Sequence, residues 1–362
     1  MGNCSSIVSS NIEESIDGQE NMVYIEESPQ DNGNLKPCSL HSRRGKKGPN
    51  QDSAILYQGY GMEEGVFYGV FDGHGRNGHI VSKLVRNRLP LLVLAQKSAL
   101  ATLNTNAINE HDYEDGEEGE LVSTKMLQQW QEACISAFKV MDKELKLQEN
   151  LDFSFSGTTA VTIIQQGEDL IIANLGDSRA VLGTITEKGL TVVQLTTDQK
   201  PSLPGEAERI KKSNGRVFAL KDEPHVQRVW LPNNNLPGLA MARAFGDFKL
   251  KDYGLIAVPD ISYHHRTVND QFLVLATDGV WDVLSNKQVA SIVWMAENEE
   301  EAAKAIVKTA VAAWAKRFPT SKVDDCTVLC CFLQERKQTQ PLITEGEPWS
   351  QKLDRSRRSR LI

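Results

Sequence analysis

Short apolar runs bounded by Gly, Asp or Asn recur along the middle of the chain. They include SAILY, GVFYGVFD, GTTAVTII, DLIIANLGD, RAVLG, LTVVQLT, HVQRVWL, QFLVLATDG and CTVLCCFL. Runs of this length with such boundaries are typical of β-strands. Tight connections such as QQGED favour antiparallel hairpins over strand-helix-strand crossovers.

Longer segments with helical periodicity lie between these strands. They are NGHIVSKLVRNRLPLLVLAQ, STKMLQQWQEACISAFKVMDKELKLQ, NKQVASIVWMAE and EEAAKAIVKTAVAAWAKRF. Each places apolar residues three and four positions apart, which gives a helix one face to bury. The pattern predicts an α+β fold, an antiparallel β-sandwich flanked by α-helices in four αββα layers.

The two ends of the chain differ in composition from its middle. Residues 1–40 are polar and without periodicity, so we expect a disordered tether, and residues 337–362 are predicted to form a basic tail. One catalytic domain is expected between them, over residues 41–336. The acidic stretch at residues 104–120 predicts a solvated loop between two helices, with a role in binding divalent ions as the alternative.

Composition and charge narrow the classes of function. Forty per cent of the 362 residues are apolar, which is enough for a substantial core. Acidic residues outnumber basic ones by 48 to 40, so we expect no nucleic acid partner. The six cysteines lack metal-finger spacing and are expected to be reduced thiols. No apolar run is long enough to span a bilayer.

Several predicted strands end or begin at aspartates. Asp72 and Asp278 each close an apolar run and precede a glycine, Asp177 follows another run, and Asp324 opens the last one. Each alone is explained by a turn or a helix cap. Together, however, carboxylates at converging strand ends need compensation, which divalent cations provide. Since the cluster offers mostly oxygen donors, it favours Mg²⁺ or Mn²⁺ over zinc.

These motifs resemble the metal-dependent, type 2C family of protein serine/threonine phosphatases. In order they are NQD, VFDGHG, SGTTA, NLGDSRAVL, MARAFGD, ATDGVWD and DDCTVL, between about Lys46 and Leu333, and the chain resembles plant-type members with an N-terminal acylation signal. The resemblance implies an antiparallel β-sandwich with two metal ions at one end. A water activated by these ions would attack the phosphate, so that no protein nucleophile is needed.

The resemblance also implies the role of individual residues. Metal ligands are expected at Asp72, Gly73, Asp278, Asp324 and Asp52, with Asp177 and Asp282 holding a weaker third ion. Among these, Asp72 would bridge both ions and Gly73 would offer its carbonyl.

Two further residues are expected to act on the substrate. His74 matches the group that protonates the leaving alkoxide, with a locally bonded turn histidine as the alternative. By spacing, Lys47 matches the family's phosphate-binding arginine. Because lysine lacks the bidentate guanidinium fork, we expect weaker phosphate binding.

The chain also departs from the family at a metal position. Gln51 stands where many members have a glutamate that binds the second metal. An amide oxygen is a poorer ligand for Mg²⁺ than a carboxylate, so a high metal requirement is expected.

The segment from about residue 200 to residue 243 resembles the family's variable flap. Arg209 could face either solvent or substrate, and the flap's charges would tune which phosphoprotein docks. Arg243 and Asp247 are expected to support the metal end through hydrogen bonds.

The leading hypothesis is a protein phosphatase acting on phosphoserine and phosphothreonine in proteins. The alternatives are a pseudophosphatase that binds a phosphoprotein or kinase without turnover and a phosphoesterase for small molecules. We expect a monomer.

The start MGNCSS matches the N-myristoylation pattern, and Cys4 could accept a palmitate. This predicts peripheral membrane association by a lipid anchor. The expected location is the cytoplasm, at the inner face of the plasma membrane, with the nucleus as a second location.

Overall fold

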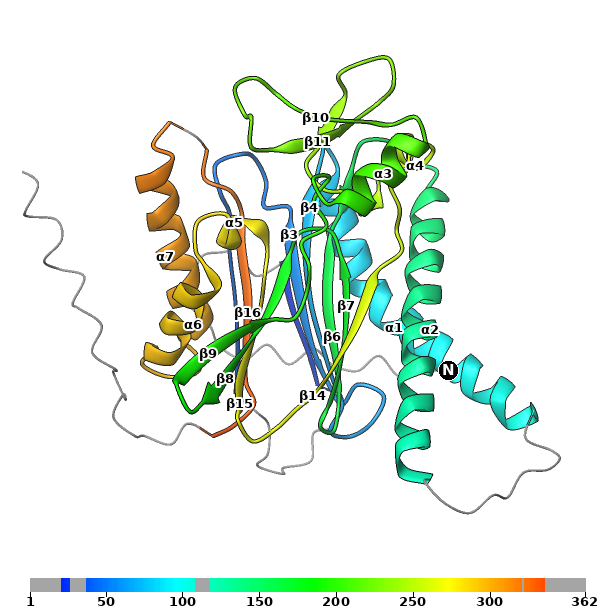
Figure 1. Ribbon diagram of the computed structural model, residues 1–362, viewed down its shortest axis with the longest axis vertical. Helices are drawn as coiled ribbons and strands as arrows, with labels where there is room; N and C mark the ends of the chain where they lie inside the picture. The colour runs from blue at the N-terminus through cyan, green and yellow to red at the C-terminus, as the bar shows by residue number, and fades with distance from the viewer. Residues whose placement is uncertain (1–20, 27–36, 108–117, 321, 336–362) are drawn as a thin grey trace, which may run out of the picture.

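A four-layer arrangement of helices and sheets organises the chain (Figure 1). The structure is a computed structural model and describes residues 21–26, 37–107, 118–320 and 322–335. Two β-sheets face each other, with long helices covering the outer face of each (Figure 1). The predicted αββα fold is therefore confirmed.

The elements follow one another along the described parts of the chain with few long connections. The strands are β1 Met22–Glu26, β2 Cys38–Arg43, β3 Asp52–Gln58, β4 Val66–His74, β5 Gly157–Thr158, β6 Ala160–Gln166, β7 Asp169–Leu175, β8 Arg179–Thr186, β9 Gly189–Gln194, β10 Arg216–Ala219, β11 Gln227–Trp230, β12 Pro237–Leu239, β13 Phe245–Gly246, β14 Asp260–His265, β15 Asp270–Ala276 and β16 Cys326–Phe332. The helices are α1 Gly78–Ala107, α2 Glu118–Lys146, α3 Pro204–Lys212, α4 Phe248–Lys251, α5 Asp278–Trp281, α6 Asn286–Met295 and α7 Ala302–Arg317.

The inner faces of the two sheets form the centre of the core. One sheet has the order β1-β3-β4-β6-β7-β14, and the other has the order β2-β16-β15-β8-β9. Tyr68 and Val70 of β4 point into the sandwich and pack with Leu273 and Leu275 of β15. The flanking Phe67 and Phe71 point outward against the helices α1 and α2. Because both faces of β4 are buried, its sequence is continuously apolar rather than alternating.

Helices close the sandwich on both sides. Val81, Val85 and Leu89 of α1 lie in the same apolar cluster as Trp130 and Phe138 of α2, against the first sheet. The helices α6 and α7 cover the second sheet through another cluster. Among the residues that the structure describes, none of the helices combines the length and the apolar character needed to cross a membrane.

A small subdomain lies beyond one end of the sandwich (Figure 1). It comprises α3 and the three-stranded sheet β10-β11-β12, residues 204–239, and we call it the flap. Its own apolar cluster includes Ile210 and Val229 and continues into Leu250 and Leu255 of the main domain. The flap is therefore packed against the end of the sandwich where the acidic residues gather.

Two expectations from the sequence are corrected. The predicted tether over residues 1–40 is interrupted, because Met22–Glu26 form β1 and pair in parallel with β3. The short run MVYIE gains its partner from β3, some thirty positions later, which local composition does not reveal. The acidic loop expected at residues 104–120 is also shorter, since α1 continues to residue 107 and α2 begins at Glu118; the remainder lies outside the described residues.

The cysteines are a third correction. Cys38 and Cys331 form a disulfide rather than two reduced thiols, whereas Cys134, Cys326 and Cys330 are free and buried. The disulfide joins neighbouring strands, because Cys38 of β2 lies opposite Cys331 of β16. A separation of 293 residues hides this pairing from the sequence.

Candidate active site

The stretch DGHG closes β4 at the flap end of the first sheet. Asp72 lies opposite Asp52 in the β3–β4 register, and the Asp72 N–H donates to the hydroxyl of Thr159 at 3.0 Å. The next residue must be glycine, because a Cβ on Gly73 would lie 2.4 Å from the Gly78 oxygen and 2.5 Å from the Gln51 oxygen. This close approach leaves the Gly73 backbone beside the Asp72 carboxylate.

Acids from the second sheet meet Asp72 at this end. Asp278 follows β15 and begins α5, and Asp324 precedes β16. Burial raises the pKa of Asp72 well above its ordinary value, and the negative charges of Asp278, Asp52 and Asp324 raise it further. The predicted ligands from both sheets therefore lie within strong electrostatic reach of one another.

The remaining acids extend the same cluster. Burial raises the pKa of Asp278, and the charges of Asp282 and Asp177 add to this effect. Burial also raises the pKa of Asp282, and the charge of Asp177 adds to this effect against the opposing charge of Lys200. Side-chain atom Oδ1 of Asp177 is buried and has no hydrogen-bond partner among the described residues. A cluster of this kind favours a compensating cation.

The donor set fits a hard divalent ion. Buried carboxylates and a nearby backbone carbonyl are the oxygen ligands that Mg²⁺ and Mn²⁺ prefer. Within the described part of the chain, however, no three His, Cys, Asp or Glu side chains form a group that could hold an ion as they stand. The individual ligands named from the sequence therefore stay predictions.

Two lysines lie among the acids. Lys47 forms an ion pair with Asp324, and Lys200 forms an ion pair with Asp177. Burial lowers the pKa of Lys200, but the charges of Asp177 and Asp278 outweigh it, so that the pKa lies above its ordinary value. Burial also lowers the pKa of Lys47, but the charge of Asp324 outweighs it, so that this pKa too lies above its ordinary value. Both side chains are therefore held as cations beside the carboxylates.

Hydrogen bonds hold the NQD stretch in place. Asp325 accepts hydrogen bonds from the Gly45 N–H at 2.7 Å and the Gln51 N–H at 2.8 Å. The Gln51 amide donates to the Gly75 carbonyl at 2.7 Å. Asp52 is buried and accepts from the Thr277 hydroxyl at 2.9 Å. Asp325 thus positions the backbone that carries Lys47 and Gln51.

His74 contacts the carboxylate of Asp247, which we expected to support the metal end. Its Nε2 lies 2.5 Å from Oδ2 of Asp247, which is 1% exposed. Burial lowers the pKa of His74, but the Asp247 charge and hydrogen bond outweigh this, so the pKa is raised. Asp247 therefore supports the histidine rather than the metal ligands.

The contacts of Arg243 and Arg209 differ from the expectations. Arg243 binds Glu206 of α3 and the Val258 carbonyl, so it fastens the flap rather than the metal end. Arg209 binds Glu206 and the carbonyls of Gly254 and Ala242, while its side chain stays 26% exposed.

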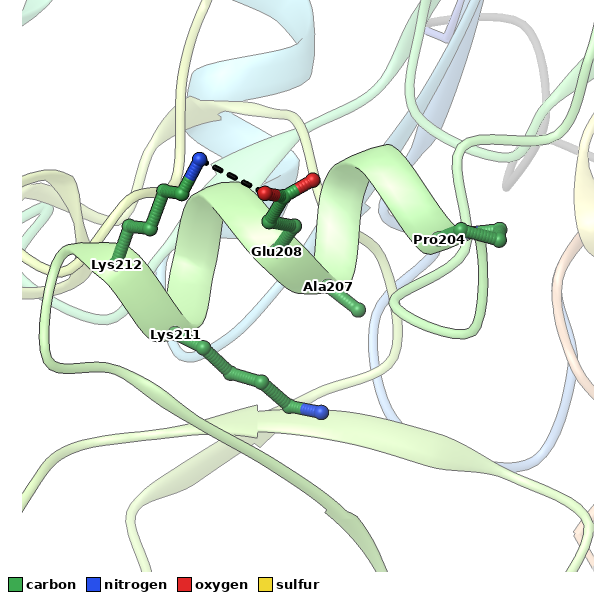
Figure 2. Close-up of a pocket in the computed structure, with 5 residues that line it drawn as sticks. All are labelled: Pro204, Ala207, Glu208, Lys211 and Lys212. Atoms are coloured by element: carbon green, nitrogen blue, oxygen red, sulfur yellow. Dashed lines mark ion pairs between the residues drawn. The ribbon is translucent and has the colours of Figure 1, made fainter.

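A surface depression of 540 Å³ lies elsewhere, along the outer face of α3 (Figure 2). Its lining residues are Pro204, Ala207, Glu208, Lys211 and Lys212. Lys212 is paired with Glu208 at 2.7 Å (Figure 2). Since none of the predicted site residues lines it, this depression is not the catalytic centre.

Three functional contacts were missed from the sequence, those of Lys200, Asp325 and Asp247. Asp325 had a local signal, since it neighbours Asp324 in DDCTVL. No local sequence signal identifies the partner of Lys200 or of Asp247. Asp247, for example, lies 173 positions from His74.

Comparison with known proteins agrees with this geometry. A family profile described as "Protein phosphatase 2C" matches residues 38–317. "Probable protein phosphatase 2C 72" of Arabidopsis thaliana is 53% identical over 346 residues, covering 93% of this chain and 99% of that protein. "Probable protein phosphatase 2C 12" of Oryza sativa subsp. japonica is 51% identical over 360 residues, covering 92% of each. The crystal structure of serine-threonine phosphatase 2C from Toxoplasma gondii superposes with a TM-score of 0.70 at 28% identity, covering 82% of this chain and 94% of that one.

Proposed function

The chain belongs to the protein phosphatase 2C family, and on this premise we propose that it hydrolyses phosphoserine and phosphothreonine in proteins at the acidic end of its sandwich. The family and its relatives make it a metal-dependent serine/threonine phosphatase. The observation that carries the location is that buried acids of both sheets meet there: Asp52 lies opposite Asp72 in the first sheet and accepts a hydrogen bond at 2.9 Å from Thr277, the residue before Asp278.

The proposed ligands follow from the donor set. Asp72, the Gly73 carbonyl, Asp278 and Asp324 would hold two ions together with Asp52, which lies opposite Asp72 in the neighbouring strand, and Asp177 with Asp282 would hold a weaker third. When bound, Mg²⁺ or Mn²⁺ supplies Lewis acidity and lowers the pKa of water, so that water becomes a nucleophile near neutral pH.

The chain's own residues would bind the substrate and move a proton. Lys47 is 55% exposed, so its ammonium group can turn from Asp324 to a phosphate oxygen. As the bond between phosphorus and the ester oxygen breaks, His74 would donate a proton to that oxygen, which leaves as the Ser or Thr hydroxyl. The non-catalytic alternative rests on Gln51 and Lys47 alone, and no contact in the described residues favours it.

The test is dephosphorylation of a phosphothreonine peptide across a titration of Mg²⁺ and of Mn²⁺. Activity should rise with metal and disappear with a chelator and in Asp278→Ala. Folded protein that is inactive at every metal concentration would refute the proposal. A small phosphate ester assayed in parallel separates a protein phosphatase from a phosphoesterase for small molecules.

We also propose that the N-terminus anchors the enzyme to the inner face of the plasma membrane. The support is the MGNCSS pattern, with Gly2 as the myristoylation site and Cys4 as a second acylation site; both lie outside the described residues. Two acyl chains hold a protein stably at a membrane, whereas one does so only marginally. Fractionation of cells that express Gly2→Ala tests this, since a variant that stays in the membrane fraction as fully as wild type would refute it.

The substrates proposed for the enzyme are phosphorylated proteins, with kinases among them, and it is proposed to act as a monomer. Sedimentation of the purified protein would test the second point.

A further inference from the structure

His74 and Asp247 form a buried pair at the edge of the acidic cluster. Nε2 of His74 lies 2.5 Å from Oδ2 of Asp247, and the side chains are 19% and 1% exposed. Asp247 stands at the start of α4 but makes no capping hydrogen bond with its side chain. Its carboxylate is therefore available to the histidine.

The backbone around Asp247 is held in place from several directions. Its own N–H donates to the Ser156 carbonyl at 2.9 Å, and the Gly246 N–H donates to the Asp142 carboxylate at 2.9 Å. Asp247 adopts a left-handed conformation, with φ of 49°, which is uncommon for a residue with a side chain. A backbone fixed in this way directs the carboxylate toward one place.

A glycine makes room for the pair. A Cβ on Gly157 would lie 2.3 Å from Oδ2 of Asp247 and 2.8 Å from Nε2 of His74. The SGTTA motif therefore contributes empty space at the point where the two side chains meet. Any larger residue would separate them.

Lys251, a basic residue of α4, is engaged elsewhere. Lys251 donates to Asp142 at 3.1 Å and to the Ala244 carbonyl at 2.7 Å. The other ring nitrogen of His74, Nδ1, is buried and has no hydrogen-bond partner among the described residues. The pair thus fixes one imidazole nitrogen and leaves the other, buried one without a protein partner among the described residues.

We propose that Asp247 is a positioning residue for the proton-donating histidine. By accepting the Nε2–H hydrogen bond, Asp247 fixes the ring so that Nδ1 is the nitrogen presented to the ester oxygen of the substrate. As the phosphorus–oxygen bond breaks, the Nδ1 proton moves to that oxygen, the N–H electron pair stays on His74, and solvent later returns a proton. The inference rests on the proposed function, since it assumes that His74 protonates the leaving group.

The test uses a double-mutant cycle of Asp247→Asn and His74→Ala with two substrates. Asp247→Asn should lower kcat for a phosphothreonine peptide about 10- to 100-fold, within the range of general acid catalysis, and leave KM within about twofold. The loss should be much smaller for p-nitrophenyl phosphate, because nitrophenolate leaves without a proton. In the His74→Ala background, Asp247→Asn should cause no further loss, since it acts through the missing ring.

Controls separate positioning from other roles. Asp252→Asn makes the same chemical change at an exposed neighbour and should behave as wild type. Mn²⁺ binding measured by calorimetry should be the same for Asp247→Asn and wild type. Equal losses on both substrates, additive losses in the cycle, or weakened Mn²⁺ binding would each overturn the inference while the phosphatase function stands. An inactive wild type would instead overturn the proposed function.

Wild-type protein provides a second measurement if Asp247→Asn does not fold. Nitrogen NMR of ¹⁵N-histidine-labelled enzyme, with His74 assigned through His74→Ala, should show a hydrogen-bonded proton on Nε2. An unprotonated Nε2 would overturn the inference.

Discussion

Replacing Glu206 with glutamine tests how the flap is fastened to the sandwich. The Glu206 side chain is 8% exposed and lies between two guanidinium groups. Arg243 donates to it at 2.6 Å from the main domain, and Arg209 pairs with it at 2.6 Å within α3. Glutamine keeps the size of the side chain but removes the charge and turns an NH₂ group toward one of the arginines.

The magnitude follows from the contacts that are lost. Hydrogen bonds to charged groups contribute about 1.5–3 kcal/mol each, and removing one partner of a buried pair costs about 3–5 kcal/mol. The two arginines are 20% and 26% exposed, so solvent screening reduces these values. We therefore expect Glu206→Gln to lower the free energy of unfolding by about 3 kcal/mol.

The assay is chemical denaturation at pH 7, with Glu208→Gln as the matched control. Glu208 is 64% exposed and pairs with Lys212 one turn away, so its loss should cost at most about 0.5 kcal/mol. If the two variants lose the same stability, the flap is not fastened through Glu206 and the reasoning is wrong.

The pH dependence gives a second check on Glu206. Burial raises its pKa, but hydrogen bonds from Arg243 and Arg209 outweigh this, so its pKa lies below the ordinary value of 4.5. A lowered carboxyl pKa means stability that is present above pH 4.5 and lost as the pH falls through the folded-state value. The difference between wild type and Glu206→Gln should therefore shrink below pH 4.5; a constant difference would contradict the assignment.

Three further predictions concern the acidic cluster. Gln51→Glu should reach half-maximal activity at several-fold less Mn²⁺, because a carboxylate is the better ligand, although it loses the hydrogen bond to Gly75; an unchanged or higher requirement would refute this. Lys200→Gln should bind Mn²⁺ more tightly in calorimetry, since the ammonium group paired with Asp177 no longer competes, and equal affinity would count against it. In chelator, thermal stability should fall as the pH rises from 5 to 8, because the raised carboxyl pKa of Asp72 means that the folded state binds more protons than the unfolded state; divalent metal should remove this trend, and a rise with pH would show the sign to be wrong.

Much of the fold could be predicted because burial leaves a local trace. The strands β4, β6 and β15 are buried on both faces, so each carries a mostly apolar run, VFYGVF, AVTII and FLVLA respectively. The helix α1 was recognised but ends later than expected, at Ala107. The strand β1 and the disulfide between β2 and β16 depend on partners far along the chain, and no local pattern encodes such partners.

The candidate site, like the fold, could be predicted from the sequence only where its residues carry a local signal. Asp72 and Asp278 carry a local signal, because each closes an apolar strand before a glycine. The partner of His74 carries none, since Asp247 is brought to it by the β5–β13 pairing, which joins Gly157 to Gly246. Local motifs therefore point to the groups proposed for the chemistry, whereas the residues that orient them emerge only from the fold.

The lysines at the acidic cluster link two properties that oppose each other, the stability of the metal-free fold and the affinity for divalent ions. Buried carboxylates that repel one another destabilise the folded state unless cations lie nearby. Lys47 and Lys200 supply such charges from the chain itself, through Asp324 and Asp177. The same ion pairs must then compete with divalent ions for these carboxylates. A high metal requirement would thus follow from the lysines as well as from Gln51, and comparing the Lys200→Gln and Gln51→Glu variants separates the two causes.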